Sequence, residues 1–219
     1  MTKEYETIKI VIEPGIGEYI EKKSRFIAEV RNVESEEEAM AFINEIKKRY
    51  WDARHNCMAF VLGENRDTMR FSDDGEPSGT AGKPILDVIL GNQITNAAIV
   101  VTRYFGGVLL GTGGLVRAYQ KAAQEALKHS VIAEKYSGIR CQITTDYNGL
   151  GKIQYLAGQE GIQLLDIRYS DMVEIDMVSE AAGFAAFKNR ITELTAAKSC
   201  FENEEPVSFY RSRDGVMII

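Results

Sequence analysis

The sequence predicts an α+β protein built from two domains. Its 219 residues leave one large or two small domains open, because a domain averages roughly 150 residues. A change in the pattern of predicted elements near residues 133–137 favours two domains. Before it, long elements alternate with glycine-rich loops. After it, the pattern is strand, helix, strand, strand, helix, strand, the split ferredoxin-like plan. We therefore expect domains over 1–135 and 136–219.

The elements of the first domain follow from periodicity and capping residues. Residues 17–31 predict a strand pair that breaks near Lys22–Lys23. Residues 35–50 predict a helix, with Ser35 and Glu38 as a capping box and acids in its first turn. The next expected elements are strands at 56–62 and 67–72, a short helix over ILDVIL (85–90), a strand at 96–102 and a helix at 113–130.

Two segments of this domain are rich in glycine. They are DDGEPSGTAGKP at 73–84 and RYFGGVLLGTGGL at 103–115. Glycine and proline at this density exclude a helix or a central strand, so both segments are predicted as loops that open helices.

The second domain is expected to bury one face of its sheet under two helices. Its elements are a strand at 137–145, a helix at 148–159, strands near 162–169 and 171–179, a helix at 180–198 and a strand at 205–212.

Composition excludes several classes of protein. Hydrophobic residues at 45% and charged residues at 26% are typical of a globular chain. The net charge of −6 argues against a protein covered in positive charge for nucleic acid. Three cysteines without a CxxC pair indicate a reduced intracellular chain, and with two distant histidines they predict no metal site. No apolar leader and no run of 18 apolar residues occurs, so we expect a cytoplasmic protein without a membrane segment.

The charge is unevenly distributed. Residues 77–133 carry a net charge of +3, although the chain as a whole is acidic. The charged residues of this window are Lys83, Arg103, Arg117, Lys121 and Lys128 against Asp87 and Glu125. Backbone N–H groups of glycine-rich loops can approach phosphate or carboxylate oxygens closely. The pattern therefore predicts an anion-binding cleft between the two loops.

Two common nucleotide motifs do not fit. A phosphate loop ending at Gly82–Lys83 would need glycine where Pro77 stands and serine or threonine where Pro84 stands. The GTGGLV run has Val116 at the last glycine position of a dinucleotide fingerprint. We expect no cofactor.

A catalytic arrangement can also be drawn from the acidic first loop. His55 could act as a general base, oriented by Asp73 or Asp74, with Ser78 or Thr80 as nucleophile. No spacing requires this arrangement, since the same acids also serve as turn formers.

The two loop segments resemble a known family. RFSDDGEPSGTAGKPIL (70–86) and IVVTRYFGGVLLGTGGLVRAY (99–119) are similar to the YigZ/IMPACT family, as are KKSRF (22–26) and DARHNCMAF (52–60). The resemblance implies an N-terminal domain with the fold of the second domain of a small-subunit ribosomal protein, also found in elongation factor G domain IV. It implies a C-terminal domain similar to elongation factor G domains III and V, and a link to translation without an established enzymatic activity.

Our first hypothesis is a module that binds RNA, the ribosome or a translation factor. Lys83, Arg103 and Arg117 would contact phosphates, and Tyr104 and Phe105 would stack on bases. Close backbone approach is expected at Gly79, Gly82, Gly106, Gly107, Gly113 and Gly114, with Arg54, His55 and Thr80 lining the same cleft.

Two other hypotheses stay open. The cleft could belong to a hydrolase or transferase acting on a small phosphate- or carboxylate-bearing substrate, with His55, Asp73, Asp74 and Ser78 doing the chemistry. Alternatively, the glycines serve only tight packing of loops against the sheet. We favour a binding protein over an enzyme, and the sequence indicates no oligomeric state.

Overall fold

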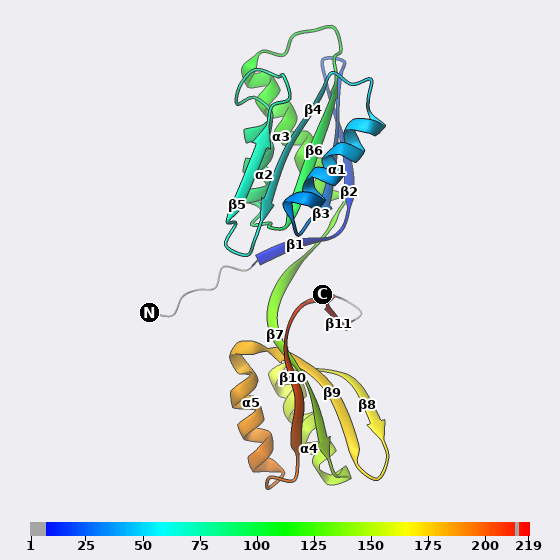
Figure 1. The fold of residues 1–219 in the computed structure, drawn as a ribbon, viewed down its shortest axis with the longest axis vertical. Helices are drawn as coiled ribbons and strands as arrows, with labels where there is room; N and C mark the ends of the chain where they lie inside the picture. The colour runs from blue at the N-terminus through cyan, green and yellow to red at the C-terminus, as the bar shows by residue number, and fades with distance from the viewer. Residues whose placement is uncertain (1–7, 213–214) are drawn as a thin grey trace, which may run out of the picture. The chain divides into compact units, whose positions relative to one another are not determined.

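The computed structural model describes residues 8–212 and 215–219. The chain divides into two compact units, Met1–Glu134 and Lys135–Ile219 (Figure 1). The elements up to the division are β1 (Ile8–Glu13), β2 (Gly15–Glu21), β3 (Ser24–Asn32), α1 (Glu36–Arg49), β4 (His55–Leu62), β5 (Thr68–Ser72), α2 (Gly82–Gly91), β6 (Ala97–Tyr104) and α3 (Thr112–Lys128). They are followed by β7 (Val131–Thr145), α4 (Tyr147–Glu160), β8 (Gln163–Tyr169), β9 (Val173–Glu180), α5 (Ala181–Leu194), β10 (Cys200–Ser212) and β11 (Gly215–Ile218).

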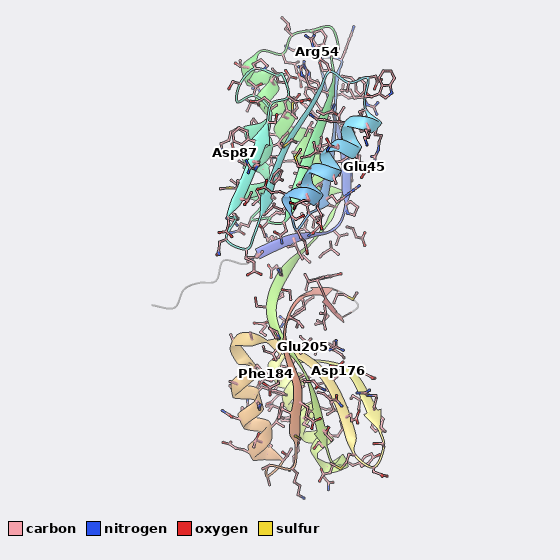
Figure 2. The ribbon with its side chains drawn as sticks, in the orientation of Figure 1. Glu45, Arg54, Asp87, Asp176, Phe184 and Glu205 are labelled. Atoms are coloured by element: carbon pink, nitrogen blue, oxygen red, sulfur yellow. The ribbon has the colours of Figure 1, made fainter. Side chains whose placement is uncertain are left out.

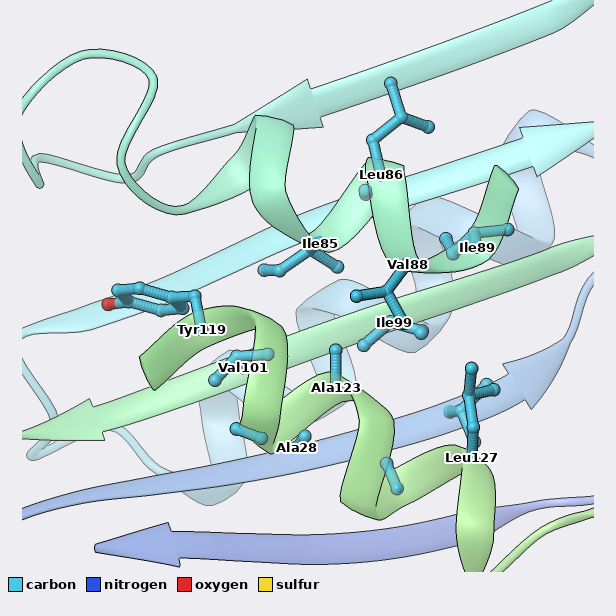
Figure 3. Close-up of a cluster of buried hydrophobic side chains, with 14 of the residues drawn as sticks. Ala28, Ile85, Leu86, Val88, Ile89, Ile99, Val101, Tyr119, Ala123 and Leu127 are labelled. Atoms are coloured by element: carbon cyan, nitrogen blue, oxygen red, sulfur yellow. The ribbon is translucent and has the colours of Figure 1, made fainter. Parts of the chain in front are cut away.

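The N-terminal unit is built on a five-stranded antiparallel sheet in the order β2-β3-β6-β4-β5. Helices α2 and α3 cover one face, where Ile85 and Ala123 pack with Ile99 of β6 (Figure 3). Helix α1 covers the other face and packs against Val100. Successive residues of β6 therefore enter different cores, which explains the uninterrupted apolar run at 97–101.

The predicted helix α1 is confirmed, including its N-cap. The hydroxyl of Ser35 accepts a hydrogen bond from the N–H of Glu38 at 3.1 Å. The Glu38 carboxylate accepts from the N–H of Glu34 at 2.8 Å, one residue earlier than a capping box requires. The helix begins with three acids and ends with three bases, as its dipole favours.

The C-terminal unit shows the predicted order of strands and helices from β7 to β10. Its sheet runs β11-β10-β7-β9-β8. Cys141 and Ile175 face a core that includes Ile153 of α4 and Phe187 of α5. At the adjacent positions of the same two strands, Arg140 of β7 and Asp176 of β9 form an ion pair at 2.6 Å. One face is thus apolar under the helices, and the other carries charge.

Several boundaries differ from the sequence prediction. Helix α5 ends at Leu194 instead of 198, because Ala196 and Ala197 adopt left-handed φ angles of 51° and 60°. Strand β10 begins at Cys200, five residues early, and contains a register shift between Glu202 and Glu205. Strands β1 and β11 are not among the elements expected from the sequence.

Candidate functional site

Both glycine-rich loops lie at one end of the five-stranded sheet (Figure 1). The loop at 73–81 joins β5 to α2, and the loop at 105–111 joins β6 to α3. Because β4 and β6 are antiparallel, the first residue of β4, His55, pairs with Arg103 near the end of β6. We call these two loops, the β2–β3 turn and the α1–β4 connection (50–54) the loop end.

The first loop is closed by a carboxylate of its own. Asp73 accepts hydrogen bonds from the N–H groups of Gly79, Ala81 and Gly82 at 2.8, 2.9 and 2.9 Å. Burial raises the pKa of the Asp73 carboxyl, but these three donors outweigh it, so the pKa lies below its ordinary value. The expectation that Gly79 and Gly82 present free N–H groups to an outside anion is therefore corrected, because Asp73 occupies that position.

A second acid of the same loop reaches into the core. The Glu76 and Arg103 side chains are 4% and 7% exposed, and they form an ion pair at 2.6 Å. Tyr119 of α3 donates its hydroxyl hydrogen to the same Glu76 oxygen at 2.8 Å. The Arg103 guanidinium also lies 5.4 Å from the Phe26 ring centre and 5.5 Å from that of Phe105. The expected phosphate contact of Arg103 is thus corrected to an internal contact that holds the loop.

Two further groups of the first loop region are satisfied internally. Thr80 is buried and donates its hydroxyl hydrogen to the carbonyl of Pro77 at 2.6 Å. The Cys57 sulfur lies 3.3 Å from the Tyr119 hydroxyl and 3.0 Å from the Asp73 carbonyl. Burial raises the pKa of the Cys57 thiol, so Cys57 is protonated at neutral pH.

The proposed catalytic residues do not form a working set. His55 Nδ1 lies 2.8 Å from the backbone carbonyl of Asp74, not from a carboxylate. The Asp74 carboxylate instead accepts from the Asn56 N–H at 2.7 Å and pairs with Lys47 at 3.0 Å. Ser78 is exposed. Among the described residues, neither a carboxylate nor a hydroxyl is hydrogen-bonded to the His55 ring.

The second loop is anchored at a single glycine. The Gly106 N–H donates to the Ser24 hydroxyl at 3.1 Å. A Cβ on Gly106 would lie 2.1 Å from the carbonyl carbon of Lys23, so no larger residue fits against the β2–β3 turn. Gly107 and Gly111 have φ angles of 82° and 72°, which glycine adopts without strain.

Beyond its anchor the second loop faces solvent. Its exposed apolar side chains are Phe105 (49%), Val108 (44%) and Leu109 (83%). Gly113 and Gly114 follow in the first turn of α3, whose N-cap makes no side-chain hydrogen bond. Unlike the first loop, the second loop contains no carboxylate that accepts hydrogen bonds from its N–H groups.

The cations near the two loops also differ in whether they have an ion-pair partner. Lys83 pairs with Asp87 one turn along α2. Arg54 and Arg117 are exposed, and in the part of the chain that the structure describes neither has a hydrogen-bond or ion-pair partner. The same holds for Lys22–Lys23 in the β2–β3 turn. Figure 2 shows Arg54 at the loop end.

Residues 22–127 match the sequence model of the Impact N-terminal domain, and residues 143–198 match a domain of unknown function, DUF1949. The chain is 42% identical over 205 residues to IMPACT family member YvyE of Bacillus subtilis (strain 168), covering 94% of this chain and 93% of that protein. The chain belongs to the IMPACT family. It is also 37% identical over 176 residues to IMPACT family member YigZ of Escherichia coli (strain K12), covering 80% and 86%.

A solved structure is also similar to this chain. A crystal structure described as a hypothetical protein superimposes with a TM-score of 0.58 at 34% identity, covering 90% of this chain and 97% of that chain. The resemblance of the loop segments to the IMPACT family is confirmed by the match of residues 22–127 to the Impact N-terminal domain and by the similarity to YvyE and YigZ.

One exposed residue of this IMPACT family member was not singled out from the sequence. Trp51 is 82% exposed, although both of its neighbours are anchored. Tyr50 donates to Glu29 at 3.0 Å, and Asp52 accepts from Tyr104 at 2.7 Å. An isolated tryptophan outside the apolar stripe of α1 is the signal that could have identified it.

Across 8–212 and 215–219, no group of three or more His, Cys, Asp or Glu side chains is placed to hold a metal ion. No helix in that part of the chain is long and apolar enough to span a bilayer.

Proposed function

We propose that this protein is a translation-associated regulator that binds RNA, the ribosome or a translation factor through its loop end. The observation that carries the proposal is that cations without a partner and exposed aromatic rings occur together at the loop end. Lys23 and Arg54 have no partner within the described residues, and Trp51 and Phe105 present their rings to solvent. Cations contact phosphates and aromatic rings stack on unpaired bases, so this surface suits single-stranded RNA.

The finer fold assignments belong to the same proposal. We assign the N-terminal unit the ribosomal-protein domain-2-like fold of elongation factor G domain IV. We assign the C-terminal unit a ferredoxin-like fold similar to elongation factor G domains III and V. The element order from β7 to β10 and the strand order β10-β7-β9-β8 support the second assignment. Fold analogy supports the class of partner and not its identity.

Binding to a labelled single-stranded RNA of about 16 nucleotides tests the proposal. Affinity is measured by fluorescence anisotropy at several salt concentrations, and we expect it to fall as salt rises. The double variant Lys23→Gln with Arg54→Gln removes two phosphate contacts. It should bind more weakly and reduce the slope of log affinity against log salt by about 1.4.

A matched control removes the same charge at the other end of the unit. Lys128 ends α3, and the β1 residue Lys9 bonds through its backbone to the chain between α2 and β6. The variant Lys9→Gln with Lys128→Gln should therefore keep the salt slope of the unchanged protein. Equal losses in both double variants, or binding that ignores salt, would contradict the proposal.

Stacking is tested with the same RNA. Trp51 is the single tryptophan of the chain, so its fluorescence reports on the loop end alone. We expect RNA to quench it, and Trp51→Ala to bind more weakly than Trp51→Phe. Co-sedimentation of the unchanged protein and of the Lys23→Gln/Arg54→Gln variant with ribosomes then shows whether the loop end binds the assembled ribosome as well as free RNA. Emission unchanged at saturating RNA would remove Trp51 from the interface.

A further inference from the structure

A hollow of about 250 Å³ lies between β2 and the first half of α3. It adjoins the loop end, because the β2–β3 turn and the second loop each contribute one lining residue. The lining residues are Tyr19, Glu21, Lys22, Leu110, Gly114, Arg117, Ala118 and Lys121. We call it the α3 hollow.

The side chains of the α3 hollow leave positive charge without a partner. Lys22, Arg117 and Lys121 face one acid, Glu21, so the lining carries a net charge of +2. Tyr19 donates its hydroxyl hydrogen to Glu21 at 2.7 Å. Tyr19 then accepts from Lys121 at 3.2 Å, and the Lys121 ammonium lies 4.9 Å from the centre of its ring.

Donors remain after these contacts are counted. An ammonium has three N–H donors, and the Tyr19 hydroxyl takes one of those of Lys121. Lys22 and Arg117 have no hydrogen-bond or ion-pair partner among the residues the structure describes. The tyrosine therefore fixes Lys121 at the wall of the hollow while its remaining donors stay available.

The N-terminus of α3 lies beside the hollow. Gly114 lies in the first turn of α3, which begins at the N-cap Gly111. The first N–H of the helix to bond back to that N-cap carbonyl belongs to Leu115, at 3.0 Å. The preceding N–H groups have no partner inside the helix and carry the positive end of its dipole.

We propose that the α3 hollow is a binding site for a phosphate group. Three cations facing one acid, with one ammonium held in place by Tyr19, match the charge and the acceptor oxygens of a phosphate group, and the positive end of the α3 dipole nearby adds to the attraction. The source is either the backbone of a bound RNA or a free nucleotide. Only the first source rests on the function proposed above, so the site stands or falls separately from it.

Calorimetry of the full chain tests the site, with inorganic phosphate, pyrophosphate and AMP as ligands at constant ionic strength. We expect saturable binding, weakened about tenfold per cation in the variant Arg117→Gln with Lys121→Gln. Lys121→Arg should keep binding. Thermal unfolding of each variant checks that the fold is intact, and Lys9→Gln with Lys128→Gln is the matched control. The same variants are then titrated with the labelled RNA.

The outcomes separate the two sources. Loss of small-anion binding in the double variant supports a free nucleotide, even if no RNA binds to the protein. No small-anion binding, with RNA affinity and salt slope both reduced in the double variant, supports a backbone phosphate. Small-anion binding that the double variant leaves intact would overturn the proposal. So would the absence of small-anion binding together with unchanged RNA titrations.

Discussion

The two glycine-rich loops share a composition and use it in opposite ways. The loop at 73–81 carries its own acids: Asp73 accepts hydrogen bonds from three N–H groups, and Glu76 forms an ion pair with the buried Arg103. The loop at 105–111 contains no acid, and it exposes apolar side chains beside unpartnered cations. Glycine density alone therefore does not make an anion site. What matters is whether the chain supplies the anion itself.

The largest expected effect comes from removing the buried acid of the first loop. Glu76→Ala leaves the Arg103 guanidinium buried without a counter-ion, and the free energy of unfolding should fall by about 3–5 kcal/mol. Urea denaturation measures this. The apolar replacement Glu76→Leu with Arg103→Met should recover much of the loss. A loss below about 1 kcal/mol for Glu76→Ala would show that the ion pair does not hold the loop.

The anchor of the second loop is the next test. A Cβ at Gly106 would meet the Lys23 backbone at 2.1 Å, so Gly106→Ala should cost about 3 kcal/mol by displacing the β2–β3 turn. A Cβ added at Gly107 would have no atom of the described residues within 4 Å, and only the φ of 82° opposes a side chain there. Gly107→Ala should therefore cost about 1 kcal/mol. Equal costs in thermal unfolding would mean that the anchor is not specific to Gly106.

Removing the capping acid of the first loop should have a smaller effect. Asp73→Ala withdraws the acceptor of three N–H groups at the start of α2 and should cost about 2 kcal/mol. Hydrogen exchange at Gly79 and Gly82 should increase while exchange in the second loop does not change. Faster exchange in both loops would contradict the separation between them.

The Asp73 carboxyl also gives a pH dependence with a definite sign. Its pKa in the folded protein is lowered from 3.8. Its stabilising contribution is therefore complete above that ordinary value and is lost as pH falls below it, through the lowered pKa of the folded state. Melting temperatures of the unchanged protein should drop more steeply below about pH 4 than those of Asp73→Asn. Parallel profiles would exclude this linkage.

The smallest effect is expected on the exposed side of the second loop. Leu109 is 83% exposed, so Leu109→Ser should change the free energy of unfolding by less than about 0.5 kcal/mol. Phe105→Ser should cost more, because its ring also contacts Arg103. A large cost for Leu109→Ser in urea denaturation would show that the second loop packs like the first.

Much of the fold could be predicted because its elements carry strong local signals. The periodicity of α1 and its Ser35 cap identify that helix, and the apolar run of β6 identifies a strand buried on both faces. The end of α5 could not be predicted, because AAK continues a helical composition while Ala196 and Ala197 turn left-handed. Such an ending depends on packing and not on propensity.

The candidate site was predicted only in part. The sequence marks both loops, and the cationic window includes Arg117. It does not show that Asp73 closes the first loop, that Arg103 is buried, or that Trp51 is exposed between two anchored neighbours. Each of these is a matter of where a side chain points, which residue type and spacing leave open.

By itself, then, the sequence determined the two-part α+β organisation, the order of its main elements, the family and the two unusual loops. These features follow from local periodicity, turn chemistry and motif. Only the tertiary structure decided which charges are satisfied. Glu76 meets Tyr119 across 43 positions of the chain, and Tyr19 meets Lys121 across 102. Contacts at that separation form only when the fold brings β2 and the loop at 73–81 against α3, so the tertiary structure determines which charges have a partner.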